Sequence, residues 1–253
     1  MKISGMTNRD IANKTGIGLR SVQKYTAHLR PSKIKIPNKI TKEKAIIHGF
    51  LSAEGYTHTT KELTGVTLKK MGKKYEYVRT HLKKPRIKVS LVFTNYQKEL
   101  NENFVKSMET AYGYTPSKEK KFAMVIHPKK IVEDILKISP IGSRKWYVPR
   151  SIAKNKLLSK CWLRAFFDGE ATVYYDKKHR KKEIRLDSVN GDSLKNVSKM
   201  LENFSIKNSF RGPYSDERFR LTISRKENLT KYKRFIGFWH PKKIALLEKS
   251  IQG

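Results

Sequence analysis

Two glutamates stand at matching places in the sequence, each at the end of an apolar run. Glu54 ends the run 45–54 (AIIHGFLSAE), and Glu170 ends the run 161–170 (CWLRAFFDGE). One glutamate at a helix end is most simply a solvated surface residue, but that reading does not explain a symmetric pair in a basic protein. Two carboxylates held close together are costly unless a cation neutralises them. Such a pair could bind a cation only in a fold that brings the two glutamates together.

The glutamate runs belong to a longer internal repeat. Segments 122–126 and 219–223 correspond, as do Lys129 and Lys226, at an offset of 97 residues (226 − 129). The glutamates are 116 residues apart (170 − 54), so the first copy holds about 19 extra residues (116 − 97). We place the extra residues in the Lys- and Tyr-rich stretch Lys61–Lys84. Two copies of one unit predict a molecule with pseudo-twofold symmetry.

The charge of the chain indicates the class of its partner. Its 253 residues include 56 Lys and Arg against 22 Asp and Glu, a net charge of +34. Such an excess costs self-repulsion in the compact state, which a polyanion relieves while releasing counterions. We expect nucleic acid as the partner, because no apolar run approaches the roughly 18–20 residues of a membrane span. The single cysteine, Cys161, excludes an internal disulfide and fits a reducing, cytoplasmic and nucleoid-associated location.

The first 30 residues predict two short helices around a turn. Thr7 suits an N-cap with Asp10 three residues later, and the turn lies at 15–18. Residues 19–29 have helical spacing, so the segment resembles a helix-turn-helix. The alternative is a helical hairpin that only packs on the rest. A linker is expected at 31–40, which holds two prolines. The side chains expected to contact DNA from the second helix are Arg20, Ser21, Gln23 and Lys24.

Each repeat predicts the order helix, two strands, helix, two strands, helix. Polar Arg86, Lys88 and Ser90 alternate with apolar residues, so one strand face packs on helices while the other is wet and basic. Such a face suits a DNA groove; an ordinary solvated face is the alternative. Strands are expected near 56–61, 86–94, 114–118, 122–127, 172–176, 183–189, 209–214 and 218–224. The strand residues expected to contact DNA are Tyr56, His58, Arg86, Lys88, Ser90, Thr172, Tyr174, Arg185, Asp187, Arg211, Arg218, Arg220 and Thr222.

The two glutamate runs resemble LAGLIDADG motifs, the signature of a homing endonuclease family. The copies are 47–55 (IHGFLSAEG) and 163–171 (LRAFFDGEA). The segment 221–229 (LTISRKENL), followed by 235–238 (FIGF) and 240–242 (HPK), also resembles the end of these domains in archaeal intron and intein enzymes. The resemblance covers roughly residue 41 to the C-terminus. Two copies with matching downstream strands make it specific.

The resemblance implies that the two motif helices pack side by side at the centre of the molecule. Small residues would let the backbones approach, namely Gly49 and Ala53 in one helix and Ala165 and Gly169 in the other. The glutamates at the helix ends would then lie near the scissile phosphates.

The resemblance also implies a metal site. Glu54 and Glu170 would bind divalent metal, helped by the carbonyls of Ala53 and Gly169. Hard oxygen ligands with open water positions suit Mg²⁺, or Mn²⁺ in its place. Metal at this site would activate water and stabilise the leaving oxygen, one DNA strand per carboxylate. The family also has basic residues that polarise water or steady the phosphate charge. Symmetric candidates for that role are Lys129 and Lys226.

The sequence departs from the motif at several positions. His48 and Arg164 are polar where a small apolar residue is usual, so we expect them to face outward or toward DNA. Ser52 and Asp168 occupy a position that helps to cap the structure and is not the main ligand. Ala171 replaces the closing glycine. None of these changes removes the glutamate pair.

We therefore expect an α+β fold with two pseudo-symmetric αββαββα subdomains that form a DNA-binding saddle, plus an all-α helix-turn-helix. The expected boundaries are 1–30, 31–40 (linker), 41–140 and 141–253. The expected function is a monomeric, site-specific double-stranded DNA endonuclease with a long asymmetric target. A non-cleaving transcription regulator and an RNA-splicing maturase are the alternatives. Two unpaired carboxylates beside DNA phosphates argue against the regulator. The basic surface does not separate RNA from DNA, and the sequence contains no stacking motif of the RNA-binding type.

Overall fold

The computed structural model describes residues 8–25, 34–71, 74–120, 122–176, 178–179 and 181–252. The chain divides into two compact units, Met1–Lys35 and Ile36–Gly253, and each is considered by itself. Across the described ranges, no helix is both long and apolar enough to cross a membrane.

The first unit contains two short helices, α1 (Asn8–Thr15) and α2 (Leu19–Tyr25). Gly16 between them has a φ of 67°, a conformation that favours glycine. Ile11 and Val22 supply the buried apolar contacts of this unit. Two helices and a turn therefore form where the sequence predicts them. The predicted cap Thr7 and the predicted continuation of the second helix to residue 29 lie outside the described residues.

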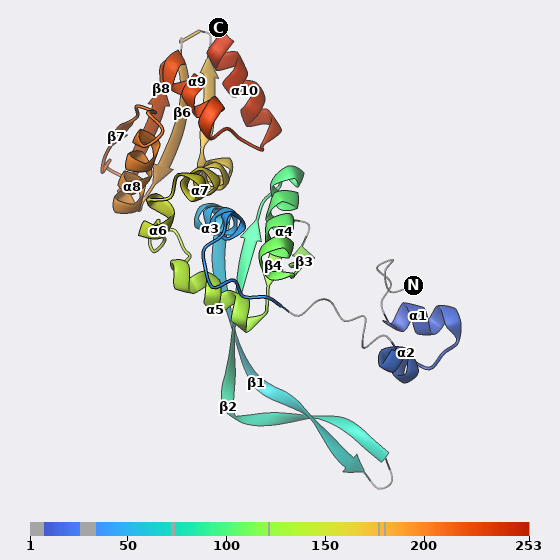
Figure 1. The fold of residues 1–253 in the computed structure, drawn as a ribbon. Helices are drawn as coiled ribbons and strands as arrows, with labels where there is room; N and C mark the ends of the chain where they lie inside the picture. Colours follow the sequence, from blue (N-terminus) through green and yellow to red (C-terminus); the bar gives the residue numbers. More distant parts are fainter. Residues whose placement is uncertain are drawn as a thin grey trace. The chain divides into compact units, whose positions relative to one another are not determined.

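The second unit consists of two similar halves (Figure 1). The elements of the first half are α3 (Lys42–Glu54), β1 (Gly55–Met71), β2 (Lys74–Thr94), α4 (Lys98–Tyr112), β3 (Ser117–Lys120), β4 (Ala123–Ile126) and α5 (Lys129–Ile138). The elements of the second half are α6 (Arg150–Ala153), α7 (Lys156–Glu170), β5 (Thr172–Asp176), β6 (Lys181–Ser188), α8 (Gly191–Glu202), β7 (Ser209–Arg211), β8 (Phe219–Ser224), α9 (Lys226–Phe235) and α10 (Pro241–Gln252).

The two halves share one topology. Each has a four-stranded antiparallel sheet, in the order β1-β2-β4-β3 in the first half and β5-β6-β8-β7 in the second. The predicted order helix, two strands, helix, two strands, helix is confirmed in both. Helix α10 is an addition that follows the second copy, and it packs on β5 and α9. The fold is therefore the expected α+β arrangement of two repeated subdomains.

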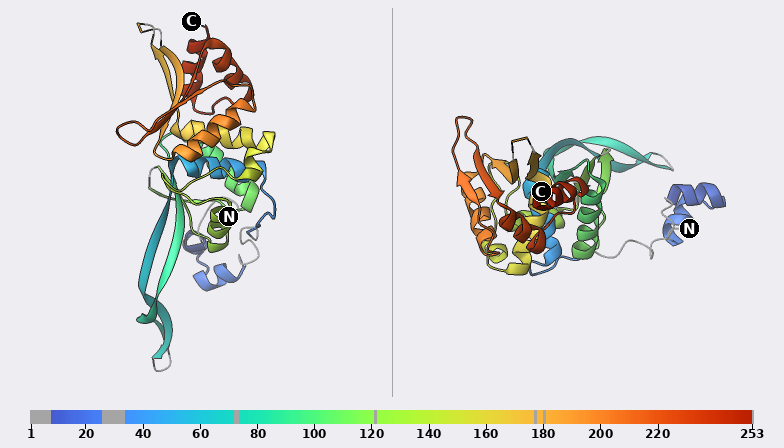
Figure 2. Two further views of the ribbon diagram at one scale, coloured as in Figure 1. Left: turned by 90° about the vertical axis from the view of Figure 1, so that its left-hand side faces the viewer. Right: turned by 90° about the horizontal axis from the view of Figure 1, so that it is seen from above.

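The main difference between the halves is a long hairpin in the first. Strands β1 and β2 have 17 and 21 residues, whereas β5 and β6 have 5 and 8. The hairpin extends well past the helices of its half (Figure 2). The sequence predicted only a short strand at 56–61 followed by extra residues, but the strand pairing continues to Met71. The register shifts between Glu62 and Thr64, opposite the part of β2 that contains Pro85, which has no N–H to donate to the ladder.

The long hairpin also overturns one expectation about burial. Ile87 and Val89 were expected to pack on helices, but their side chains are 67% and 37% exposed. Leu91, two residues further along the same face, is fully buried. Ile87 and Val89 instead border an open hollow of about 920 Å³, with Val132 and Leu136 of α5 among its other lining residues.

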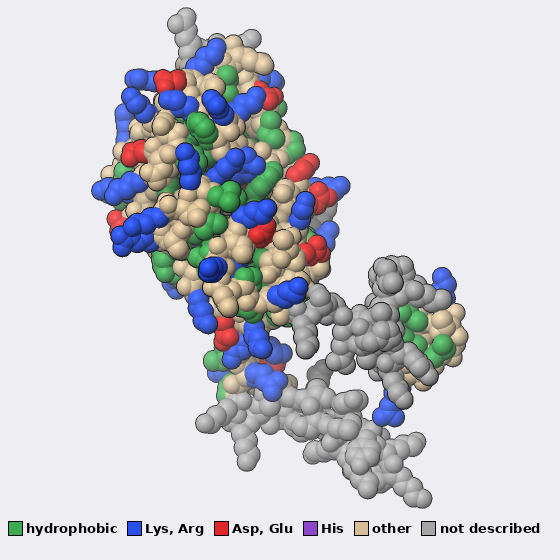
Figure 3. Space-filling model, in the orientation of Figure 1, with side chains coloured by type: hydrophobic (Ala, Val, Ile, Leu, Met, Phe, Trp, Pro, Cys, Tyr) green, Lys and Arg blue, Asp and Glu red, His purple; other side chains and the backbone are tan. Residues whose placement is uncertain are grey.

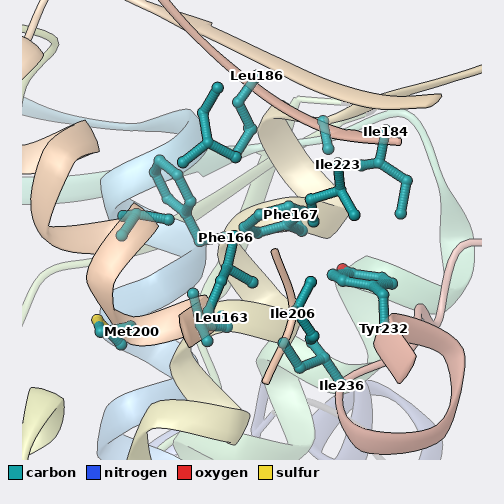
Figure 4. Close-up of a cluster of buried hydrophobic side chains, with 14 of the residues drawn as sticks. Leu163, Phe166, Phe167, Ile184, Leu186, Met200, Ile206, Ile223, Tyr232 and Ile236 are labelled. Carbon is teal, nitrogen blue, oxygen red and sulfur yellow. The ribbon is translucent and has the colours of Figure 1, made fainter. Parts of the chain in front are cut away.

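Each half has its own apolar core, and the helices α3 and α7 lie at the boundary between the two. The core of the second half combines side chains of α7 with those of β6, β8, α8 and α9. Figure 4 shows Leu163, Phe166 and Phe167 of α7 at its centre, with Tyr232 of α9 beside them. Ala45 of α3 packs in the core of the second half, and Ala165 of α7 packs in the core of the first. The two motif helices are therefore shared by both cores, which fixes the position of each relative to the other.

Candidate active site

The two motif helices approach each other through glycine. A Cβ atom added at Gly49 of α3 would lie 2.6 Å from the carbonyl oxygen of Trp162 in α7. One added at Gly169 of α7 would lie 2.5 Å from Cβ of Ala53 in α3. Real Cβ atoms do not come this close to backbone or carbon atoms, so both positions require glycine. The predicted contact through small residues is confirmed.

His48 lies inside this helix contact, which corrects the expectation that it faces outward. Its side chain is fully buried. The indole Nε1–H of Trp162 donates to His48 Nδ1 at 3.0 Å, and the hydroxyl of Ser52 lies 3.3 Å from the same nitrogen. Burial lowers the pKa of His48 to about 4, so the imidazole is neutral at ordinary pH. His48 is thus a polar link between α3 and α7.

Arg164 likewise turns toward the protein and not toward solvent alone. Its Nε donates to the carbonyl oxygen of Ile236, and its guanidinium lies 5.2 Å from the ring centre of Trp239. Both partners belong to the segment between α9 and α10. The arginine therefore ties the motif helix to the chain that leads into α10.

Glu54 and Glu170 meet where α3 and α7 end. Both line one pocket of about 440 Å³, together with the residues that begin β5 and follow β2. Burial, together with the nearby Glu54 carboxylate, raises the pKa of Glu170 to about 7, and Lys243 acts in the opposite direction. The side chain of Glu170 still reaches solvent at the pocket, which screens this repulsion. Burial also raises the pKa of Glu54, opposed by Asn95 and Lys243. The structure therefore places both glutamates in one pocket, where each disfavours the charge of the other.

Asn95 holds one of the two carboxylates. It directly follows β2 and is buried, and its side-chain amide donates to Oε2 of Glu54. The other end of the side chain is engaged as well, because Asn95 Oδ1 accepts from the backbone N–H of Gln97 at 2.7 Å. The sequence analysis missed Asn95, since an asparagine between a strand and a helix is most simply a turn residue.

Lys243 of α10 brings a cation to the same pocket. Its Nζ donates to the carbonyl oxygens of Asp168 at 2.6 Å and Phe167 at 3.1 Å, and that of Gly169 lies 3.5 Å away. These are carbonyls of the last turn of α7, where a positive charge is favoured by the helix dipole. Burial lowers the pKa of Lys243 to about 8, although the surrounding carboxylates oppose the shift. The sequence analysis missed this residue among 56 Lys and Arg.

Asp168 explains how α10 is held in place to present that lysine. Its buried carboxylate accepts from the backbone N–H of Trp239 at 2.9 Å and from that of His240 at 3.0 Å. Burial raises the pKa of Asp168 to about 6, with these two hydrogen bonds acting in the opposite direction. The motif position that was expected to cap the structure thus anchors the segment that leads into α10.

Lys129 and Lys226 do not line the pocket that holds the two glutamates. Lys129 begins α5, is largely exposed and lies 3.6 Å from Glu133 on the same helix. Lys226 begins α9 and borders a separate hollow beside Arg225. Both follow the last strand of their sheets, and the chain there has already left the pocket at the ends of the motif helices. The cation at the pocket comes instead from α10, which has no counterpart in the first copy.

The strand residues predicted to contact DNA in the first half share one face of the hairpin. The register pairs Tyr56 with Val92 and His58 with Ser90, and Lys88 and Arg86 continue the same face along β2. Tyr56, His58, Arg86 and Lys88 are exposed. The hairpin therefore presents a polar, basic face that runs away from the glutamate pocket.

The second half has a comparable face. Buried Ile184, Leu186, Leu221 and Ile223 point to the helices, so the residues that alternate with them lie on the uncovered side of the sheet. Arg218 precedes β8 and is held by Asp216 in the turn, outside the sheet. Figure 3 shows Lys and Arg side chains spread over the visible surface of the two halves, with fewer Asp and Glu. The predicted residues on the uncovered side are Thr172, Tyr174, Arg185, Asp187, Arg211, Arg220 and Thr222.

The predicted contacts of the first unit are described only in part. Arg20 and Ser21 lie on α2 and are exposed. The side chains of Gln23 and Lys24 lie outside those that the structure describes.

Comparisons with known proteins agree with this geometry. Residues 159–237 match the family described as LAGLIDADG-like domain. The homing endonuclease I-DmoI in complex with DNA and Mn is 15% identical, with 78% of this chain and 96% of that chain covered and a TM-score of 0.52. I-DmoI in complex with DNA and Ca is 16% identical, with 82% and 97% covered and a TM-score of 0.53. No curated protein sequence matches the chain.

Identities this low establish a shared fold and leave the activity to be argued from the residues themselves. The matched segment 159–237 contains most of α7 with the second motif, the second sheet and all of α9. The structural matches extend over most of the remaining chain. Residues 159–237 are therefore similar to a LAGLIDADG-like domain, and the described chain shares the two-subdomain fold of the I-DmoI structures.

Proposed function

We propose that this chain is a metal-dependent, site-specific endonuclease that hydrolyses one phosphodiester bond in each strand of a duplex DNA target. The observation that carries the proposal is the meeting of Glu54 and Glu170 in one pocket at the ends of α3 and α7. Asn95 and Lys243 lie beside them in the same pocket. They orient or neutralise a carboxylate pair that would otherwise be unfavourable.

The donors at the pocket fit a hard divalent cation. The two carboxylates and the backbone carbonyls of Ala53 and Gly169 are all oxygen ligands, which Mg²⁺ and Mn²⁺ accept. Within the described ranges, no group of three or more His, Cys, Asp or Glu side chains could hold a metal. Water and phosphate oxygens would therefore complete the coordination, as is usual for Mg²⁺. A bound cation would supply an activated water and stabilise the leaving oxygen.

The side chains around the pocket have distinct roles in this proposal. Glu54 and Glu170 hold the cation, each serving one strand of the duplex. Asn95 fixes the orientation of the Glu54 carboxylate. Lys243 supplies the positive charge that we had assigned to Lys129 and Lys226, because it lies at the pocket and they do not. Its ammonium steadies phosphate charge from the α7 side.

The surroundings of the pocket support duplex DNA as the substrate. The chain carries a net charge of +34, and a basic, uncovered sheet face adjoins each glutamate. Strands of the two halves differ greatly in length, 17 and 21 residues against 5 and 8. A long asymmetric target is therefore proposed, with the longer contact on the side of the first half. Since one chain supplies both glutamates, we propose that the monomer is the active form.

Cleavage of DNA by purified protein tests this proposal. Wild type, Glu54→Gln/Glu170→Gln and Glu133→Gln would be incubated with a plasmid library of randomised targets, with Mg²⁺, with Mn²⁺ or with EDTA. Glu133 is a matched control, because it is an exposed glutamate on α5 away from the pocket. We expect linear product that requires the metal, persists in Glu133→Gln and disappears in the double variant.

Three results would contradict the proposal. Duplex binding without a cut under either metal would indicate a DNA-binding regulator. Preferential binding of structured RNA over duplex DNA, measured in competition, would indicate an RNA-directed role. A cut that survives in the double variant would place the chemistry elsewhere in the chain.

A further inference from the structure

We infer that the half-site bound by the second half contains guanines read by Arg185 and Arg220, and that Asp187 holds both arginines in the orientation required. This inference rests on the proposed DNA target and adds to it the base recognised and the residues that recognise it. It also explains why an aspartate stands on a surface that otherwise suits a polyanion.

The three side chains form one cluster on the uncovered face of the second sheet. Asp187 of β6 and Arg220 of β8 are direct partners in the strand register, and Arg185 precedes Asp187 by two residues on the same face. Arg220 Nε donates to Asp187 Oδ1 at 2.6 Å, and Arg185 Nε lies 3.1 Å from Oδ2. Each carboxylate oxygen therefore serves one arginine, and the cluster keeps a net charge of +1.

Two tyrosines lie against the guanidinium groups. The guanidinium of Arg185 lies 4.4 Å from the ring centre of Tyr174 and donates through Nη2 to its hydroxyl. The guanidinium of Arg220 lies 5.2 Å from the ring centre of Tyr214. Stacking and ion pairing together hold each fork before any ligand binds, which reduces the side-chain entropy lost on binding. A lone surface ion pair contributes little stability, so such an arrangement suggests a role in recognition.

Guanine is the base that matches a fixed arginine fork. In the major groove it presents two acceptors side by side, N7 and O6, whereas adenine presents an acceptor beside an N6 donor. Arginine only donates hydrogen bonds, so the N6 amino group of adenine would place a second donor against one of its N–H groups. Contacts to phosphate do not need an oriented fork, and the many exposed lysines of this chain can make them. The carboxylate of Asp187 also argues for a place among the bases, because beside phosphates it would be repelled.

The register locates these guanines near the cleaved bond. Arg185 pairs with Thr172, which follows Glu170 by two residues. Neighbouring strands are about 4.8 Å apart. At the matching register the first half has Val92, Thr94 and Ala123, so the described residues there include no such cluster. We therefore place the guanines close to the cut, in one half-site only.

Selection of binding sites from randomised duplexes tests the inference without cleavage. The full chain would be used in EDTA, as wild type, Asp187→Asn, Arg220→Lys and Glu62→Gln, and the bound DNA sequenced. Wild type should enrich guanine about tenfold or more at two positions of one half-site, the discrimination typical of a bidentate contact. Asp187→Asn should lower the preference at both positions, and Arg220→Lys at one of them while total affinity is retained. Glu62→Gln, which removes a carboxylate that is ion-paired with Lys88 on the hairpin of the first half, should change neither.

Several results would overturn the inference. One is wild-type sites with no guanine preference in either half-site. Another is an unchanged guanine preference in an Asp187→Asn protein whose Tm equals that of wild type. A third is a uniform loss of affinity across all sequences in both variants, which would assign the arginines to phosphates. These results are separate from failure of the proposed DNA target, in which wild type would select no duplex at all, and from failure of cleavage, which this selection in EDTA does not measure.

Discussion

Replacing Gly169 by alanine should push α3 and α7 apart at the point where they carry the glutamates. The new Cβ would lie 2.5 Å from Cβ of Ala53, about 1 Å inside an ordinary contact of roughly 3.5–4.0 Å. Overpacking of this kind costs about 1–3 kcal/mol, while alanine regains about 0.8–1 kcal/mol of helix propensity. We expect a net loss of up to about 2 kcal/mol, or a fall in Tm of up to about 8 °C for a unit of this size.

The effect on activity should exceed the effect on stability. The added methyl also lies 3.3 Å from Cγ of Glu54, so the strain falls on the carboxylate pair. A displacement of about 1 Å at reacting groups can slow a reaction about 10²-fold. Thermal melting by circular dichroism would give the change in Tm. Initial rates of DNA cleavage, measured well below the Tm of both proteins, would give the change in activity.

A second substitution makes this reasoning falsifiable. Ala53→Gly removes the carbon atom that Gly169→Ala would strike, so the double variant should recover most of the lost rate. Ala53→Gly alone should lose only about 1 kcal/mol of helix propensity. Gly18→Ala is a control, since its Cβ would meet no atom within 4 Å. A double variant no faster than Gly169→Ala, or a Gly169→Ala protein with wild-type Tm and rate, would refute the close-contact argument.

Three further predictions concern charge and reach. Lys243→Met leaves the last carbonyls of α7 without their ammonium donor, which should cost about 1–3 kcal/mol and slow cleavage, whereas exposed Lys249→Met should change neither. In metal-free protein the pKa of Glu170 is raised from 4.5 to about 7. Its contribution to stability is therefore fully present below about pH 4.5 and is lost as the pH rises through about 7. The Tm, measured at several pH values from 5 to 8, should therefore fall less with rising pH in Glu170→Gln than in wild type. The same dependence of Tm on pH in both proteins would contradict this. Joining β1 to β2 by a short turn in place of residues 65–81 should shorten the footprint on one side of the cut by about 8 base pairs; an unchanged footprint would show that the hairpin does not lie along DNA.

The sequence by itself determined those features that depend on local pattern. Alternation and helical spacing predicted the order of elements in both halves, because periodicity reflects which side of each element is buried. The internal repeat paired Glu54 with Glu170, and the glycines of the two motifs indicated that the helices approach closely. Net charge indicated the class of partner. Each of these is a property of one segment or of the composition, so no knowledge of distant contacts was needed.

Tertiary structure decided which other side chains reach the glutamates. Asn95 is 41 residues from Glu54 in the chain, and Lys243 comes from α10, which lies outside the repeat. Symmetry of the sequence pointed instead to Lys129 and Lys226, because a repeat cannot reveal a residue present in one copy only. The orientation of His48 also depended on the partner helix, since a polar residue on an apolar helix is buried only when another side chain, here Trp162, satisfies it. Contacts between distant segments depend on how the elements pack, and a local sequence pattern does not specify that packing.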